Sequence, residues 1–129
     1  MKKILVVEDD FDSRKGLGIR LRAHNYEPVF AIDSVAAVKT ALTTRPDLVL
    51  LDLGLPGGDG FAVLQRFKDL TPLADLPVIV LTGMSCHAKR ERAAELGVDG
   101  YLQKPADNEV LMDRIRATLE KQDPAPDAD

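Results

Sequence analysis

Short apolar runs alternate with amphipathic segments along the chain. The apolar runs predict strands near residues 3–8, 27–31, 47–52, 77–82 and 98–102. The segments between them have helical patterns and predict helices near residues 12–24, 34–44, 60–70, 86–96 and 107–121. In the last of these, Leu111, Ile115 and Leu119 recur every four positions and form one core face. Strands and helices that alternate in this way indicate βαβ units and a parallel sheet with helices on both faces.

The expected fold is a doubly wound α/β domain over residues 1–121, with a five-stranded parallel sheet in the flavodoxin-like order 2-1-3-4-5. Ser34 and Asp107 are the expected N-caps of the second and fifth helices. Gly16 and Gly18 lie inside the first helix and weaken it by roughly 1 kcal/mol each relative to alanine. The sequence shows no reason for these two glycines.

Carboxylates follow two of the predicted strands where they reach the edge of the sheet. The apolar run 48–51 ends in Asp52, and the first strand ends in Glu8, Asp9 and Asp10. In the expected strand order the first and third strands are neighbours, and their carboxyl ends flank the switch point of the fold. Because acids are rarely buried without a partner or a metal, the two strands predict a divalent-cation site. For Asp10 a helix-capping role stays open, since acids favour a helix N-terminus.

Composition narrows the classes of function. The chain has 129 residues, of which 45% are hydrophobic and 29% charged, as in an ordinary globular domain. The net charge of −4, with three acids in the Pro- and Ala-rich tail or linker start at 122–129, argues against a nucleic-acid-binding surface. No stretch approaches the roughly 20 apolar residues of a membrane span. The single cysteine, Cys86, excludes an internal disulfide and predicts a reducing, cytoplasmic location.

Three further polar residues belong to the same edge of the predicted sheet. Thr82 ends the fourth strand, Tyr101 lies in the fifth strand, and Lys104 follows it. Each is unremarkable alone, since a threonine at a strand end or a lysine in a loop is common. Together with the acids they place a hydroxyl donor and an ammonium group beside clustered carboxylates.

In this combination and order, the residues resemble the receiver domains of response regulators in bacterial two-component systems. The resemblance covers residues 2–121. The matching stretches are 6–10, 51–56 with Gly60, 81–83 and 101–105.

The resemblance implies that Asp52 accepts a phosphoryl group as an aspartyl phosphate. It also implies that Mg²⁺ is held by Glu8, Asp9, Asp52 and the backbone carbonyl of Gly54, an all-oxygen set that suits this ion. The donor would be a sensor histidine kinase or a phosphotransfer protein. The chain would assist its own phosphorylation and dephosphorylation without being a turnover enzyme.

The resemblance assigns Thr82 and Lys104 to contacts with phosphoryl oxygens, and Tyr101 to a rotation that reports whether Thr82 is engaged. It further implies a cis peptide bond before Pro105. The signal would reach an output protein or domain through the face formed by the fourth helix, the fifth strand and the fifth helix. A phosphorylation-dependent homodimer stays open, and no direct contact of this chain with nucleic acid or membrane is expected.

The chain departs from the family pattern at Gly83, where alanine is frequent. Met84 and Gly54 occupy the positions that tend to set the lifetime of the phosphoryl group, and neither residue has a polar side chain that could position a water molecule. Two alternatives stay open beside a stand-alone receiver. One is the N-terminal regulatory domain of a longer regulator, with a linker starting near residues 123–126. The other is an aspartate-nucleophile phosphatase, against which Gly54 argues because such enzymes carry a second acid there.

Overall fold

The computed structural model describes residues 1–55, 60–83 and 86–122 of the chain. The strands are β1 (Lys2–Val7), β2 (Tyr26–Ala31), β3 (Leu48–Leu51), β4 (Val78–Thr82) and β5 (Gly100–Gln103). The helices are α1 (Phe11–Ala23), α2 (Ser34–Thr44), α3 (Gly60–Asp69), α4 (His87–Glu95) and α5 (Asn108–Gln122). All predicted elements are confirmed, with ends within two residues of the prediction. A short 3₁₀ helix, η1 (Thr71–Leu73), was not predicted.

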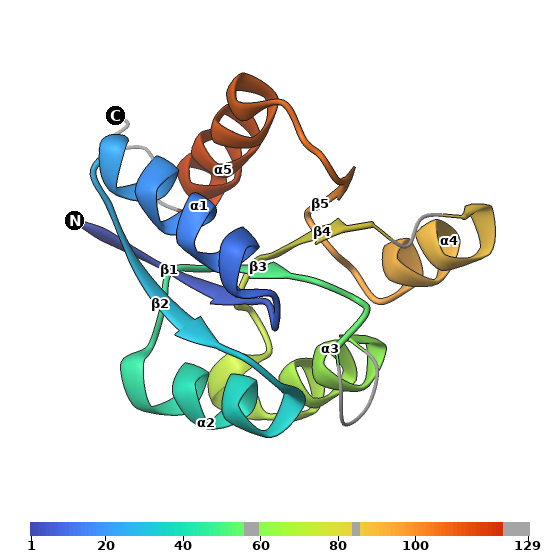
Figure 1. Cartoon of the computed structure of the whole chain (residues 1–129). Coiled ribbons are helices and arrows are strands. Elements are labelled where there is room, and N and C mark those ends of the chain that lie inside the picture. Colours follow the sequence, from blue (N-terminus) through green and yellow to red (C-terminus); the bar gives the residue numbers. More distant parts are fainter. Residues whose placement is uncertain (56–59, 84–85, 123–129) are drawn as a thin grey trace, which may run out of the picture.

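The five strands form one parallel sheet in the predicted order β2-β1-β3-β4-β5. In Figure 1, α1 and α5 lie on one face of the sheet and α2 and α3 on the other, while α4 lies at the side where β4 and β5 run. Val7 pairs with Leu51 in the register of β1 and β3. The residues that follow these two, Glu8 and Asp52, therefore leave the sheet side by side.

The inner strands are buried on both faces, which explains their unbroken apolar sequences. All residues of β3 and β4 are buried. Side chains of β1 alternate between two cores: Leu5 and Val7 face a cluster formed with α2 and α3, whereas Ile4 and Val6 face a cluster formed with α1 and α5. These two cores hold the carboxyl edge of the sheet in a fixed position.

The helix caps differ from the prediction at one place. Asp107 caps α5, because its carboxylate accepts a hydrogen bond from the backbone N–H of Val110 at 3.2 Å. The predicted cap Ser34 is wrong: it is the first residue of α2, and the preceding Asp33 accepts from the N–H of Ala36 at 2.8 Å. Both residue types cap helices well, so the backbone conformation determines which of the two is the N-cap. Asp33 has the extended conformation of an N-cap, with φ of −152°.

One of the two helical glycines has a structural reason. A Cβ atom on Gly18 would lie 3.0 Å from Cζ of the Phe30 ring, so the glycine lets β2 pack closely against α1. At Gly16 a Cβ atom would meet nothing within 4 Å. Among the described residues, no helix has the length and apolar character needed to cross a membrane.

Candidate functional site

Asp52 lies immediately after β3 and is held by three backbone or hydroxyl contacts. Its own N–H donates to the carbonyl of Val7 at 3.1 Å, which ties it to the end of β1. Its Oδ1 accepts from the N–H of Gly54 at 3.0 Å and from the Thr82 hydroxyl at 2.9 Å. The carboxyl group is therefore oriented by the neighbouring strand ends, and it remains half-buried and reachable.

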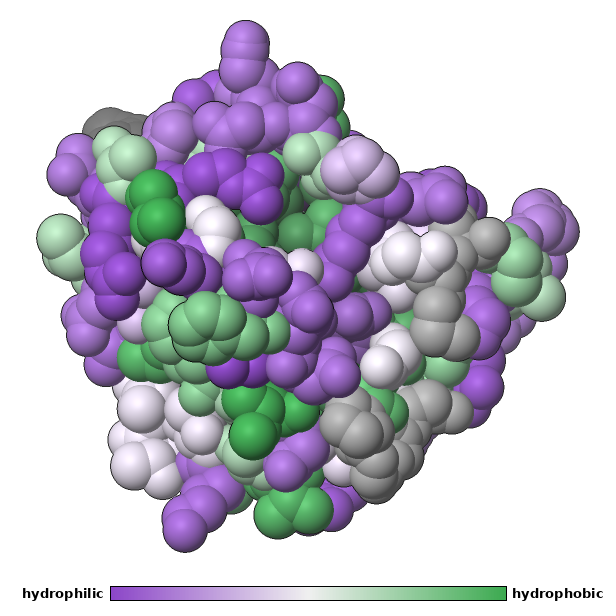
Figure 2. Space-filling model, in the orientation of Figure 1, coloured by the Kyte–Doolittle hydropathy of each residue, from purple (hydrophilic) through white to green (hydrophobic). Residues whose placement is uncertain are grey.

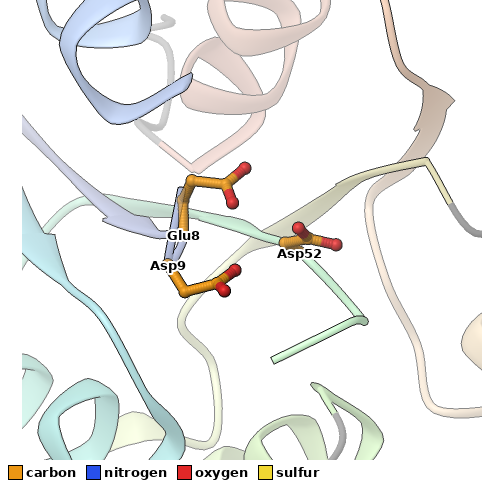
Figure 3. Close-up of side chains that lie close together, drawn as sticks. All are labelled: Glu8, Asp9 and Asp52. Carbon is orange, nitrogen blue, oxygen red and sulfur yellow. The ribbon is translucent and has the colours of Figure 1, made fainter. Parts of the chain in front are cut away.

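Glu8 and Asp9 complete a cluster of three carboxylates with Asp52. Figure 3 shows Glu8 and Asp9 at the end of β1 with their carboxyl groups directed towards the side where Asp52 lies. One carboxylate oxygen from each residue lies within 4.8 Å of the others. Glu8 is buried, Asp52 is intermediate and Asp9 is exposed, so the cluster opens from the core towards solvent.

Lys104 supplies positive charge to this cluster. Its ammonium group contacts Glu8 Oε1 and lies 3.3 Å from Asp52 Oδ2. Lys104 reaches this position because its N–H donates to the carbonyl of Thr82, at 2.9 Å, where β5 leaves the sheet. The peptide bond between Lys104 and Pro105 is cis, as expected from the resemblance.

Burial and charge shift two protonation equilibria at the site. Burial raises the pKa of the Glu8 carboxyl above its ordinary value, and the nearby Asp52 charge acts in the same direction, while bonds from Lys104 and from the N–H of Asp10 oppose the shift. Burial by itself would lower the pKa of Lys104, but its contacts with Glu8 and Asp52 outweigh burial and raise that pKa. The ammonium form of Lys104 is therefore favoured.

The three carboxylates suit a hard divalent cation. Among the described residues, the ion pairs of Glu8, Asp9 and Asp52 are those with the Lys104 ammonium, so the three ionised carboxylates keep an excess of negative charge. All of its side-chain ligand atoms are oxygens, and its open side leaves room for water ligands. Mg²⁺ prefers this combination of few carboxylates and several waters.

Gly60 shows why the chain needs a glycine at the start of α3. Its N–H donates to the carbonyl of Leu53 at 2.9 Å. A Cβ atom at Gly60 would lie 2.6 Å from Leu53 Cα and 2.7 Å from the carbonyl oxygen of Asp52, closer than real contacts allow. The helix can therefore pack directly on the backbone that carries Asp52.

Tyr101 lies on β5, next to the strand that carries Thr82. It pairs with Val80, whereas Thr82 pairs with Gln103. Its ring is partly buried and packs against a small cluster that includes Val80 and Ala93. The guanidinium carbon of Arg90, on α4, lies 4.6 Å from the centre of the Tyr101 ring, a cation–π distance. The ring thus connects β5 with α4.

The structure brings together five of the side chains that the sequence analysis singled out: Glu8, Asp9, Asp52, Thr82 and Lys104. It also adds two arginines that the sequence analysis missed. Arg14 donates to the backbone carbonyls of Asp9 at 2.8 Å and Glu8 at 3.3 Å, which fixes the loop after β1. The sequence could have indicated Arg14, because this residue lies about one helical turn after the acids that end the first strand. No local sequence pattern could have indicated Arg90, because its partner Tyr101 lies in a different element. Met84 lies outside the described residues.

Comparisons with known proteins agree with this site. Residues 4–116 match the family described as response regulator receiver domain. The chain is 36% identical over 128 residues to the DNA-binding dual master transcriptional regulator RpaA of Synechocystis, covering 99% of this chain and 53% of that protein. It is 36% identical over 123 residues to the phosphate regulon transcriptional regulatory protein PhoB of Escherichia coli, covering 95% and 54%.

A solved receiver-domain structure from Methanospirillum hungatei, described as CheY-like, superposes with a TM-score of 0.88 at 25% identity and covers 95% of this chain and 96% of that one. The fold, the site and the family match together define a signalling module with an acidic pocket. This chain belongs to the response regulator receiver domain family. It spans about half the length of the two regulators named above.

Proposed function

We propose that Asp52 accepts a phosphoryl group and that the chain converts this event into altered protein contacts. The observation that carries the proposal is the position of the Asp52 carboxyl group. It is half-buried, within 2.9 Å of a hydroxyl donor, 3.3 Å from an ammonium group and beside two further acids. A carboxylate in such surroundings is a reachable nucleophile with groups ready to stabilise added phosphoryl charge.

In the proposed transfer, an Asp52 oxygen forms a bond to phosphorus while the bond from phosphorus to the donor's histidine nitrogen breaks, and that nitrogen keeps the electron pair. Mg²⁺ held by Glu8, Asp9 and Asp52, with the carbonyl of Gly54, would offset the carboxylate charges and draw nucleophile and phosphoryl oxygens together. The Lys104 ammonium, which lies 3.3 Å from Asp52 Oδ2, would pair with a phosphoryl oxygen after the transfer.

The proposed switch starts at Thr82. Its hydroxyl donates to Asp52 in the structure, and a phosphoryl oxygen on Asp52 would offer it a new acceptor. One charge-assisted hydrogen bond contributes about 1.5–3 kcal/mol, whereas a swing from 1:99 to 99:1 needs about 5.5 kcal/mol. Because the new bond replaces the one that Thr82 already donates to Asp52, its net gain is smaller still, and Thr82 alone gives a partial population shift. The Lys104 and Mg²⁺ contacts have to contribute the remainder, or activation is graded.

The face formed by α4, β5 and α5 is the proposed output surface. Only Ala93 of α4 is buried, so little hydrophobic packing opposes a movement of this helix. Arg90 of α4 lies over the Tyr101 ring, so a rotation of this ring would change a contact that α4 makes. An output protein or domain, or a second copy of the chain in its phosphorylated form, is the proposed partner there.

The proposed donor is a sensor histidine kinase or a phosphotransfer protein, and the proposed role is that of a phosphoacceptor without turnover of an external substrate.

A second arrangement is favoured by the length comparison: the regulators named above are nearly twice as long as the matched region. In that arrangement residues 1–121 regulate an output domain after a linker at 122–129, of which 123–129 lie outside the described residues. The full length of the gene product decides between the two. The cytoplasmic location stays a prediction.

Labelling with a small phosphodonor, such as acetyl phosphate, tests the proposed function. With Mg²⁺ present, the wild type should gain the mass of one phosphoryl group, and Asp52→Asn should gain none because its amide is not a nucleophile. Asp12→Asn, which removes an exposed acid outside the cluster, is the matched control and should label like wild type. Stoichiometric labelling of Asp52→Asn would assign the phosphoacceptor to another residue.

A further inference from the structure

A groove between α1 and the edge strand β2 carries exposed hydrophobic side chains that the acidic site does not use. It has a volume of about 460 Å³. Its apolar lining includes Phe11, Ile19 and Phe30, which are 65%, 59% and 36% exposed. Figure 2 shows hydrophobic residues set among hydrophilic ones on the face where α1 and β2 lie. Apolar side chains gathered in a polar-rimmed groove mark an interaction surface, whereas scattered single ones need no explanation.

The part of the groove that α1 forms is one stripe of this helix. Its lining residues on this helix recur every three or four positions from Phe11 to Arg22, which is about 16 Å along the helix axis. Gly18 forms part of this lining, and the Phe30 ring lies where a Cβ atom on residue 18 would be 3.0 Å from it. The glycine thus keeps the ring seated against α1. A helical stripe of this length suits a partner helix laid along it.

The charge of the groove is opposite to that of the chain as a whole. Arg14, Lys15 and Arg22 line it, and no acid occurs among its described lining residues. The chain has a net charge of −4. Arg14 is also fixed in place, since its guanidinium donates to the carbonyl of Asp9 and lies 5.7 Å from the centre of the Phe11 ring. The groove therefore offers a local positive rim around an apolar floor.

We propose that this groove binds an amphipathic helix of a partner protein, with apolar residues on one side and aspartate or glutamate residues flanking them. The apolar side would cover Phe11, Ile19 and Phe30, and the acidic flanks would meet Lys15 and Arg22. A second copy of this chain fits less well, because a twofold contact through the groove would bring the same cations against one another. The interaction uses none of the side chains of the carboxylate cluster, so it does not require a phosphoryl group on Asp52.

A titration with designed peptides tests the proposal. Two synthetic helical peptides of about four turns share one pattern of leucine and phenylalanine positions, and carry either glutamate or lysine at the remaining positions. Each is added to the ¹⁵N-labelled full chain while amide shifts are recorded. The glutamate peptide should shift the amides of residues 11–22 and Phe30. It should bind at least about tenfold more tightly than the lysine peptide, and weaken as salt screens the rim.

Two variants of the groove and one matched control sharpen the result. Ile19→Glu and Lys15→Glu should each weaken the glutamate peptide by about tenfold or more, through lost apolar contact and reversed charge respectively. Val110→Glu puts a glutamate in place of another exposed β-branched residue, on α5 and 50% exposed, and should bind like wild type. Asp52→Asn should also bind like wild type. Thermal melts confirm that each variant is folded.

Three outcomes would overturn the proposal. The first is equal binding of the acidic and basic peptides. The second is peptide-induced shifts that lie outside the groove or survive both Ile19→Glu and Lys15→Glu. The third is sedimentation of the chain alone as a dimer that Ile19→Glu dissociates, which would assign the groove to a second copy. None of these outcomes bears on phosphoryl acceptance, which the labelling of Asp52 measures separately.

Discussion

Mg²⁺ should stabilise the folded chain by relieving repulsion among Glu8, Asp9 and Asp52, and Asp9→Ala should remove most of that effect. The three carboxylates have ligand oxygens within 4.8 Å of one another. At this distance, two unit charges in a medium of effective dielectric constant 20 repel by roughly 3.5 kcal/mol. Lys104 is bonded to two of the acids, and Asp9 is not among them. A divalent cation that binds only the native state should therefore raise the free energy of unfolding.

The size of the effect follows from mass action. At free Mg²⁺ about ten times its dissociation constant, native-state binding adds about 1.4 kcal/mol to the free energy of unfolding. For a chain of 129 residues this corresponds to a rise in Tm of about 5 °C. If Asp9→Ala weakens the metal tenfold, the gain falls to about 0.4 kcal/mol, or roughly 1.5 °C.

Differential scanning calorimetry with and without Mg²⁺, followed by excess chelator, measures these gains. The comparison is between the metal-induced increments, so a change in the metal-free Tm of a variant does not disturb it. Asp12→Ala removes a nearby exposed acid that lies outside the cluster and should keep the full increment. Equal gains in Tm for Asp9→Ala and wild type would show that the metal binds elsewhere.

Three other predictions address the switch and the helices. Thr82→Ala should still accept a phosphoryl group, yet the amide shifts that a phosphoryl mimic induces in α4 and α5 should shrink; shifts of full amplitude would remove Thr82 from the mechanism. Gly16→Ala should raise the free energy of unfolding by about 1 kcal/mol in urea denaturation, because its Cβ meets open space. Gly18→Ala should gain clearly less or lose stability, since its Cβ would press on an aromatic ring at 3.0 Å, and equal gains at both sites would contradict this packing. Asp33→Ala should cost about 1 kcal/mol and Ser34→Ala under half of that, and the reverse order would place the cap of α2 at Ser34.

The sequence by itself determined the fold class and the positions of the acids. Buried parallel strands require unbroken apolar runs, so β1, β3 and β4 were visible as such. A carboxylate that ends such a run has to emerge at the carboxyl edge of the sheet. For that reason the sequence alone assigns Glu8 and Asp52 to one pocket.

The tertiary structure decided which groups contact one another. Lys104 meets Glu8 across 96 positions of the chain, and Arg90 stacks on Tyr101 from a different element. Gly18 makes room for Phe30 of a neighbouring strand. The first contact depends on how the ends of distant strands meet in the sheet, and the other two depend on how helices lie against it. Local patterns of apolar and polar residues do not specify either arrangement.

The cap of α2 shows the same limit on a short scale. Asp33 and Ser34 are adjacent and both are good capping residues, so the sequence pattern permits either. The extended backbone of Asp33 after β2 aims its carboxylate at the N–H of Ala36 and makes Ser34 the first helical residue. Sequence periodicity locates a helix to within about a turn, and the path of the preceding loop sets its first residue because only that path fixes the backbone angles at the cap.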